Sequence, residues 1–145
     1  MTLLREGARQ RCGDRRVRKV SNVVTMRQEE PLRLDSERLA DMFVDLGEVR
    51  ASHLIVLSID RLETLIEGLD LAVGQICPKD CIDLTGQIRA LGDTMGMISL
   101  SSAARNVARA AQSGDPVAID ATLARLKRVA VRSFRLAEAL QHRSG

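Results

Sequence analysis

The amino-acid sequence predicts an all-α protein: an antiparallel up-down-up-down four-helix bundle with a short additional helix on its N-terminal side. After Pro31, apolar residues recur three and four positions apart, which is the spacing of one helix face, and no segment alternates as a strand does. Only Phe43 and Phe134 are aromatic, so the core must consist of Leu, Ile, Val, Ala and Met. Short turns separate the predicted helices, and helices joined by short turns pack antiparallel.

The first two predicted helices lie between Asp35 and the low seventies. Asp35 or Ser36 can cap a short helix that ends near Gly47. A longer helix is expected from about Val49 into the low seventies, where Gly74 and a turn at residues 78–80 interrupt it. Its expected apolar face consists of Leu54, Leu57 or Ile59, Leu62, Leu65, Ile66 and Leu69.

The third predicted helix begins after Asp80, which can cap it. Its apolar stripe is Leu84, Ile88, Leu91, Met95 and Ile98. Gly92 and Gly96 are expected to loosen the end of this helix. Ser99 or Ser101 can then cap a helix of small residues that stops at residues 113–115.

The last predicted helix begins with Asp115 as its cap and Pro116 in its first position. One of its faces is basic, with Arg125, Lys127, Arg128, Arg132 and Arg135. This face is interpreted as a solvated surface, with a docking surface for an acidic partner as the alternative. The predicted common core of the bundle comprises Leu62, Ile66, Leu84, Ile88, Leu91, Leu126, Val129 and Phe134.

The segment from Asp83 to Asp115 resembles the C and D helices of histidine phosphotransfer (HPt) domains. HPt domains carry His-x-x-Lys-Gly near the middle of the C helix, and a glycine-containing turn follows about three turns later. When Gly96 is placed on that turn and Gly114 at the end of the D helix, no gap is needed. The resemblance covers about residues 35–141 and implies an HPt-like bundle.

The same alignment places Gly86 at the acceptor histidine, Arg89 at the lysine and Ala90 at the following glycine. Gly86 cannot hold a phosphate, whereas Arg89 keeps the positive charge beside it. The resemblance therefore implies a module of two-component phosphorelay signalling that binds a response-regulator receiver domain or a histidine kinase without accepting phosphate, a pseudo-phosphotransferase.

In HPt domains the face around the acceptor, on the B and C helices, docks the receiver. The implied docking face here consists of Arg89, Ala90 and Asp93, with Ile66, Asp70 and Val73 on the preceding helix. A turn centred near Pro78 would place Asp70 level with Gly86. His53 lies 17 residues before Asp70, roughly 25 Å along a helix, and His142 lies in the C-terminal tail. Neither histidine is expected to replace the acceptor.

A second hypothesis remains open beside the signalling one. The bundle can instead serve as a structural or oligomerisation unit with no phosphorelay role, for example as a homodimer. An exposed apolar strip that binds a second copy of the chain would favour this hypothesis.

Catalysis, cofactors and small-molecule substrates are not expected. Ser101 and Ser102 have no histidine nearby, and residues 92–96 are not a phosphate-binding loop. The absence of Trp and Tyr argues against stacking platforms for nucleic acid and against aromatic-lined pockets. A zinc site at Cys77 and Cys81 is not expected, because both histidines are distant in sequence.

A cytoplasmic location is expected. The three cysteines are sparse and odd in number, which favours a reducing compartment. No apolar run approaches the roughly 20 residues of a membrane span, and the N-terminus has no signal-peptide pattern.

Residues 1–34 are predicted to be a basic arm, and residues 35–145 the bundle. Residues 1–25 carry a net charge of +5, so the net +3 of the chain comes wholly from them. Three interpretations stay open: Met26 is the natural start, the arm is an inert tail, or it contacts nucleic acid or an anionic membrane. No nucleic-acid or membrane partner is expected for the bundle itself.

Overall fold

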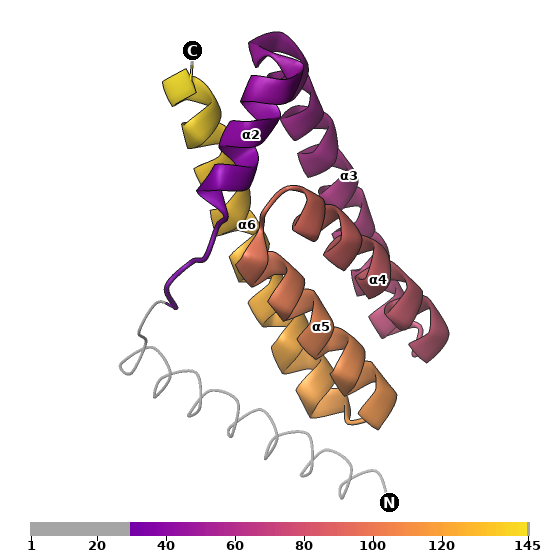
Figure 1. Ribbon diagram of the computed structural model, residues 1–145. Helices are drawn as coiled ribbons and strands as arrows, with labels where there is room; N and C mark the ends of the chain where they lie inside the picture. Colours follow the sequence, from indigo (N-terminus) through magenta and orange to yellow (C-terminus); the bar gives the residue numbers. More distant parts are fainter. Residues whose placement is uncertain (1–29, 145) are drawn as a thin grey trace, which may run out of the picture. The chain divides into compact units, whose positions relative to one another are not determined.

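The computed structural model describes residues 30–144, and every regular element within them is an α-helix (Figure 1). The helices are α2 (Ser36–Leu46), α3 (Glu48–Gly74), α4 (Pro78–Thr94), α5 (Ile98–Ser113) and α6 (Pro116–Ser144). The predictions for the start and role of the basic arm fall on residues 1–29, outside the described part of the chain. No helix between residues 30 and 144 is long and apolar enough to cross a membrane.

Helices α3 to α6 form a bundle in which each helix packs against the next and α6 returns to α3. Figure 1 shows consecutive helices running in opposite directions, as the short connections require. The short α2 packs against α3. The predicted all-α bundle with an additional short helix is therefore confirmed.

The core consists mainly of aliphatic side chains, which come from all five helices. Leu62, Ile88 and Leu126 are fully buried at 0% exposure, and Leu39 is the buried residue of α2. Of the predicted common core, Ile66, Val129 and Phe134 are also buried, whereas Leu84 and Leu91 pack against the core half-buried.

The two aspartate caps act as predicted. Asp35 is the N-cap of α2, and its Oδ1 accepts a hydrogen bond of 3.1 Å from the backbone N–H of Arg38. Asp115 Oδ1 accepts one of 3.0 Å from the N–H of Val117. Pro116 begins α6, where its missing N–H costs nothing.

The starts of α4 and α5 differ from the prediction. Pro78 is the first residue of α4 and Cys77 its N-cap, so residues 78–80 are helical and Asp80 is not the cap. Met97 is the N-cap of α5, without a side-chain hydrogen bond. Ser101 is buried instead, and its hydroxyl donates to the carbonyl oxygen of Arg89 at 3.3 Å. Polar residues near a helix start are ambiguous in this way, because a hydroxyl can bond to another helix as readily as to its own.

Gly92 and Gly96 allow close packing between segments, whereas the prediction was that they loosen the end of α4. α4 runs through Gly92, where a Cβ would lie 2.7 Å from Ser101 Oγ, so glycine allows α5 to pack closely. Gly96 has φ +69° in the turn between α4 and α5, and a Cβ there would lie 2.9 Å from the carbonyl oxygen of Asp35. The N–H of Asp35 donates to the Gly96 carbonyl at 2.7 Å. Gly96 thus joins the start of α2 to this turn.

Candidate functional site

Gly86 lies on the outward face of α4. Gly86, Ala90 and Asp93 are exposed and recur at helical spacing, whereas Ile88, between them, is buried. A Cβ built at Gly86 would have nothing within 4 Å. The backbone at this position is therefore open to an approaching molecule, and a side chain could be added without a clash.

Arg89 lies at the seam between α4 and α5. Its side chain is half-buried, and its Nε is buried with no hydrogen-bond partner. Its backbone carbonyl accepts the hydrogen bond from Ser101. An unpartnered buried guanidinium nitrogen is uncommon, because leaving a donor of a charged group unsatisfied is costly. The Nε of Arg89 is therefore enclosed by the protein, although the side chain as a whole is only half-buried.

Two contacts fix the register of α3 against α4. Arg61 Nη2 donates to Gln87 Oε1 at 3.3 Å. A Cβ at Gly68 would lie 3.7 Å from the methyl groups of Leu84, so these residues pack side by side. Antiparallel pairing then brings about residues 62–66 level with Gly86. The predicted partner position, Asp70, is wrong, because the turn is centred nearer Ile76 than Pro78.

Of the three docking residues predicted on α3, Ile66 lies near the level of Gly86 with a buried side chain, and Asp70 and Val73 lie beyond that level. Ile66 is 9% exposed and belongs to the core. Asp70 forms an ion pair of 2.7 Å with Lys127 of α6. Val73 is half-buried and lines a cavity at the end of the bundle. The structure therefore does not group these three side chains with Gly86 on one exposed face.

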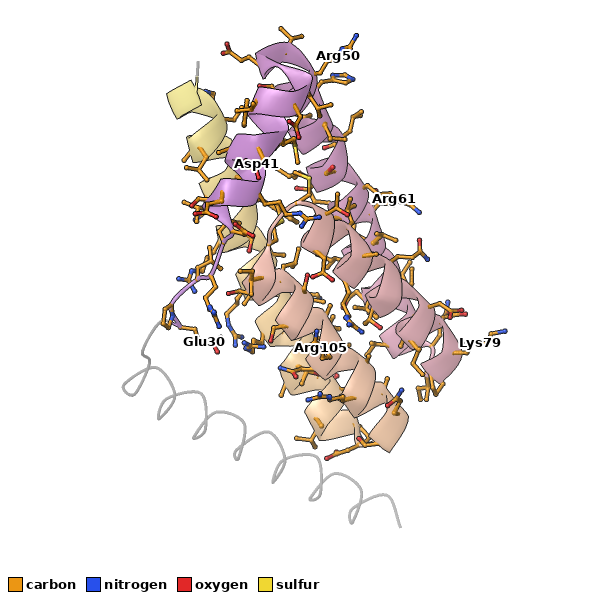
Figure 2. The ribbon with its side chains drawn as sticks, in the orientation of Figure 1. Glu30, Asp41, Arg50, Arg61, Lys79 and Arg105 are labelled. Carbon is orange, nitrogen blue, oxygen red and sulfur yellow. The ribbon has the colours of Figure 1, made fainter. Side chains whose placement is uncertain are left out.

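An exposed apolar strip lies farther toward the N-terminus of α3, roughly 8–18 Å before the level of Gly86. Leu54 and Leu57 are 37% and 51% exposed. They line a shallow groove together with Leu46, Val49, Arg50 and His53. Spacings of three and four residues place Leu54, Leu57 and Arg61 on one side of α3, and Arg61 reaches Gln87, beside Gly86. In Figure 2 the Arg61 side chain projects outward from α3. We call Leu46, Val49, Leu54 and Leu57 the apolar groove.

The sequence pattern placed Leu54, and Leu57 or Ile59, on the apolar face of this helix, and of these three side chains only Ile59 is buried. A signal against that assignment was available in the helix lengths. α3 has 27 residues and α4 only 17, so the first part of α3 extends past the end of α4. Apolar residues on that part of α3 have no α4 side chain to cover them.

Neither described histidine lies beside Gly86. His53 is exposed at the rim of the apolar groove. With the observed register it precedes the Gly86 level by roughly 13–20 Å along α3, closer than the sequence predicted but still remote. His142 is exposed near the end of α6.

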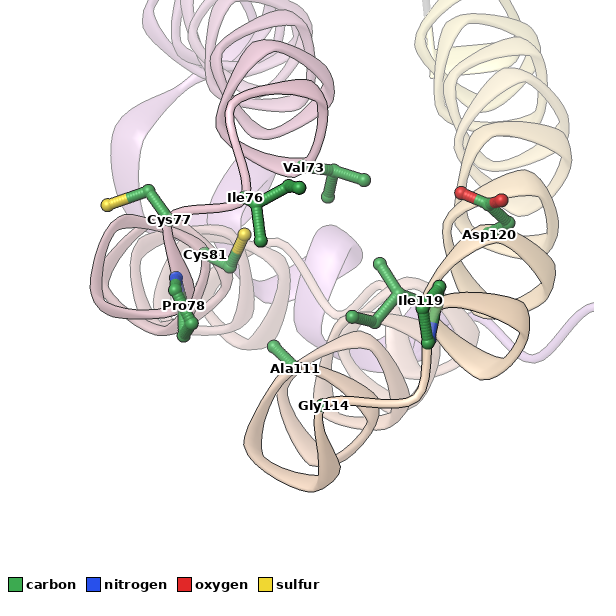
Figure 3. A pocket seen from close by; sticks show the side chains of 10 residues that line it. Val73, Ile76, Cys77, Pro78, Cys81, Ala111, Gly114, Ile119 and Asp120 are labelled. Carbon is green, nitrogen blue, oxygen red and sulfur yellow. The ribbon is translucent and has the colours of Figure 1, made fainter. Parts of the chain in front are cut away.

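A cavity of about 150 Å³ lies where the α3–α4 and α5–α6 turns meet (Figure 3). Val73, Ile76, Cys81 and Ile119 supply apolar parts of its wall. Ile76 adopts φ +55°, a strained conformation for a β-branched residue, and is 85% exposed. Burial, with smaller contributions from Cys77 and Asp80, raises the pKa of the Cys81 thiol. The thiol is therefore protonated at neutral pH and is a poor nucleophile.

The described residues include no group of three His, Cys, Asp or Glu side chains that could hold a metal ion. The features at Gly86 are an open backbone position and a half-buried arginine, and the apolar groove lies farther toward the N-terminus of α3. Exposed apolar grooves are typical of surfaces that bind other proteins.

No protein-family model and no curated protein matches the chain. Among solved structures it resembles the crystal structure of histidine-containing phosphotransfer protein B (HptB) from Pseudomonas aeruginosa PAO1, with a TM-score of 0.70 and 16% sequence identity. The likeness covers 77% of this chain and 96% of that one. The predicted HPt-like fold is therefore confirmed.

Proposed function

We propose that this chain is an HPt-like module of phosphorelay signalling that binds a receiver domain or a histidine kinase without accepting phosphate. The observation that carries the proposal is the exposed glycine in the middle of α4, at the position where the HPt alignment places the acceptor histidine. The fold likeness to HptB, which spans nearly all of that protein, supports the comparison of the two helices.

Phosphoryl transfer from a receiver to an HPt domain needs an imidazole nitrogen in line with the phosphoaspartate. Gly86 supplies no nucleophile, and His53 is too far along α3 to reach a phosphoaspartate placed opposite Gly86. Arg89 retains a cation at this face, which favours the acidic phosphorylation site of a receiver. The module therefore binds its partner and leaves the phosphoryl group where it is.

The docking face that we propose combines the α4 residues predicted from the sequence with the exposed apolar groove nearer the N-terminus of α3. Gly86 and Ala90 provide a flat surface for close approach, and Arg89 provides charge. Leu54 and Leu57 of the apolar groove provide apolar area, which standard interfaces need at their centre. Asp93 lies at the C-terminal end of the same α4 face.

A phosphotransfer assay tests the proposal. The chain is incubated with radiolabelled phospho-receivers and active kinases, and association is measured separately by calorimetry. We expect binding without label on the wild-type chain. Acid-labile label that is lost on His53→Ala or His142→Ala would overturn the proposal.

The substitution Gly86→His provides the constructive test. The space at Gly86 is open, so an imidazole can be added, and histidine is a better helix former than glycine. We expect this variant to gain acid-labile label. Gly74→His is the matched control, because Gly74 is also exposed with nothing within 4 Å of its added Cβ, but lies at the end of α3. Equal labelling of both variants would contradict the assigned position.

A structural or oligomerisation role is the second candidate, and the apolar groove favours it specifically. Val49 is 83% exposed, and Val44 on α2, near the groove residue Leu46, is 81% exposed. Apolar side chains exposed to this extent can be covered by a second copy of the chain. Sedimentation equilibrium distinguishes the candidates. A dimer that Leu57→Glu dissociates, together with no binding to any receiver or kinase, would favour the structural role.

A further inference from the structure

The cavity where the α3–α4 and α5–α6 turns meet has an apolar interior. Cys81 and Ala111 lie deepest in its wall, each with 3% of its surface exposed. Val73 extends into the cavity from the α3 side and Ile119 from α6 (Figure 3). A free cysteine packs as a small apolar side chain. The four residues together therefore enclose a space that has no strong hydrogen-bonding group to hold water.

Small residues leave this space of about 150 Å³ unfilled. Ala111 ends at its Cβ, and a Cβ built at Gly114 would have nothing within 4 Å. Ile76 is large enough to fill the space, but its side chain is 85% exposed at the mouth. Protein interiors are usually close-packed. Apolar cavities of about 150 Å³ stay free of water and bind molecules of the size of benzene.

The end of α3 provides a second observation that points to this cavity. The N–H of Cys77 donates to the carbonyl oxygen of Ala72 at 3.1 Å, and the N–H of Ile76 donates to that of Val73 at 3.2 Å. This pair of bonds ends a helix with one left-handed residue, which is usually glycine. Here that residue is Ile76, with φ +55°. A β-branched residue in this conformation is strained, and strained residues are concentrated at ligand-binding sites.

We propose that this cavity binds a small uncharged apolar molecule of about six to eight carbon atoms, and that the Ile76 side chain covers the bound molecule. The ligand contacts Cys81 and Ala111, and its binding buries the side chain of Ile76. No bond is made or broken. Within the described part of the chain, Asp120 is the one charged residue that lines the cavity, and it is exposed. Its carboxylate repels an anion, so the ligand carries no negative charge.

This inference goes beyond the proposed function and does not depend on it. The cavity lies at the C-terminal end of α3, whereas the apolar groove lies near the N-terminal end of the same helix. Gly86 and Arg89 do not line the cavity. Binding of a ligand here can therefore be measured without a receiver or a kinase.

Titration of the full chain with toluene, followed by ¹H–¹⁵N NMR, tests the site. We expect saturable shifts at the amides of Val73, Ile76, Cys81, Ala111 and Ile119. Burial of seven carbon atoms should give a dissociation constant of about 0.1–1 mM. Benzoate has a similar ring but a negative charge, so it should bind more weakly than toluene.

The substitution Ile76→Gly tests the covering role of this side chain. Glycine adopts the left-handed conformation without strain, so the variant should fold and should melt no lower than the wild type. Each methylene group of Ile76 that covers the ligand contributes a factor of about four in affinity, so toluene should bind about four- to fifteenfold more weakly. Val117→Ala is the matched control. It shortens a 75% exposed apolar side chain at the same end of the bundle, outside the cavity wall, and should leave the toluene affinity unchanged.

Absence of saturable shifts at the cavity residues, up to the solubility limit of toluene, would overturn the inference. Shifts confined to the apolar groove would place toluene there instead and would also overturn it. Equal toluene affinity of Ile76→Gly and the wild type would refute the covering role of Ile76. Tighter binding of benzoate than of toluene would contradict the assigned class of ligand.

Discussion

Substitution of single glycines by alanine tests the packing at the junction of α2, α4 and α5 quantitatively. Gly96 has φ +69°, and an added Cβ would lie 2.9 Å from the backbone oxygen of Asp35, which cannot rotate away. The left-handed conformation costs an alanine about 1–2 kcal/mol, and disturbing the hydrogen bond between Asp35 and Gly96 adds about 1 kcal/mol. We therefore expect Gly96→Ala to lower the free energy of unfolding by about 2–3 kcal/mol.

Alanine substitutions at two other glycines separate the cost of the left-handed conformation from the cost of the contact with Asp35. Gly114 has φ +73° with nothing within 4 Å of an added Cβ, so Gly114→Ala should incur only the conformational cost. Gly86 lies inside α4 with open space around it, so Gly86→Ala should stabilise the protein by about 0.5–1 kcal/mol.

Chemical denaturation of the four proteins measures these differences, provided that the denaturant dependence of the unfolding free energy is unchanged. Equal losses for Gly96→Ala and Gly114→Ala would show that the contact with Asp35 contributes nothing. A destabilising Gly86→Ala would refute the conclusion that the fold itself does not require glycine at this position.

Three further predictions concern the core, an ion pair and the apolar groove. Ile88→Ala should lower the free energy of unfolding by about 2–5 kcal/mol, because Ile88 is fully buried. Leu91→Ala should lower it less, because Leu91 is only half-buried. Thermal unfolding of both variants measures the order, and a larger loss of stability for Leu91→Ala would contradict the packing. Asp70→Asn should change stability by less than about 1 kcal/mol, since the pair with Lys127 is exposed, and any effect should shrink at high salt. Leu57→Ser should leave the free energy of unfolding within about 0.5 kcal/mol of the wild-type value, because Leu57 is exposed. The same substitution should weaken association with a partner protein, which calorimetry measures. Unchanged association would exclude the apolar groove from the interface.

Helix positions and most of the core were predictable from the sequence. Apolar spacing located every described helix, and the aspartates at 35 and 115 marked two helix starts correctly. These features depend on local chemistry that a short stretch of sequence contains. The start of α4 was less certain, since Pro78 suits both a turn and the first turn of a helix.

The faces of α3 could not be predicted in the same way. Apolar residues occur on more than one side of this helix, and which of them lies inside depends on where the neighbouring helices end. The position of the turn near Ile76 sets the register of α3 against α4, and an error of about four to eight residues placed Asp70, instead of residues 62–66, level with Gly86. The assignment of Gly86 came from the resemblance to HPt domains, and no physical property of a glycine would have suggested it.

The order in which helices pack also has a consequence for how the chain folds. From α3 to α6, each helix packs against the one that follows it in sequence, so most contacts join segments close along the chain and little loop-closure entropy opposes them. The segment before α2 is different, since Arg33 donates a hydrogen bond to Ser99 Oγ, 66 residues away. We expect the bundle to form rapidly, on the microsecond-to-millisecond scale typical of such topologies. The segment before α2 should dock onto the turn between α4 and α5 in the last step, after that turn exists to receive it.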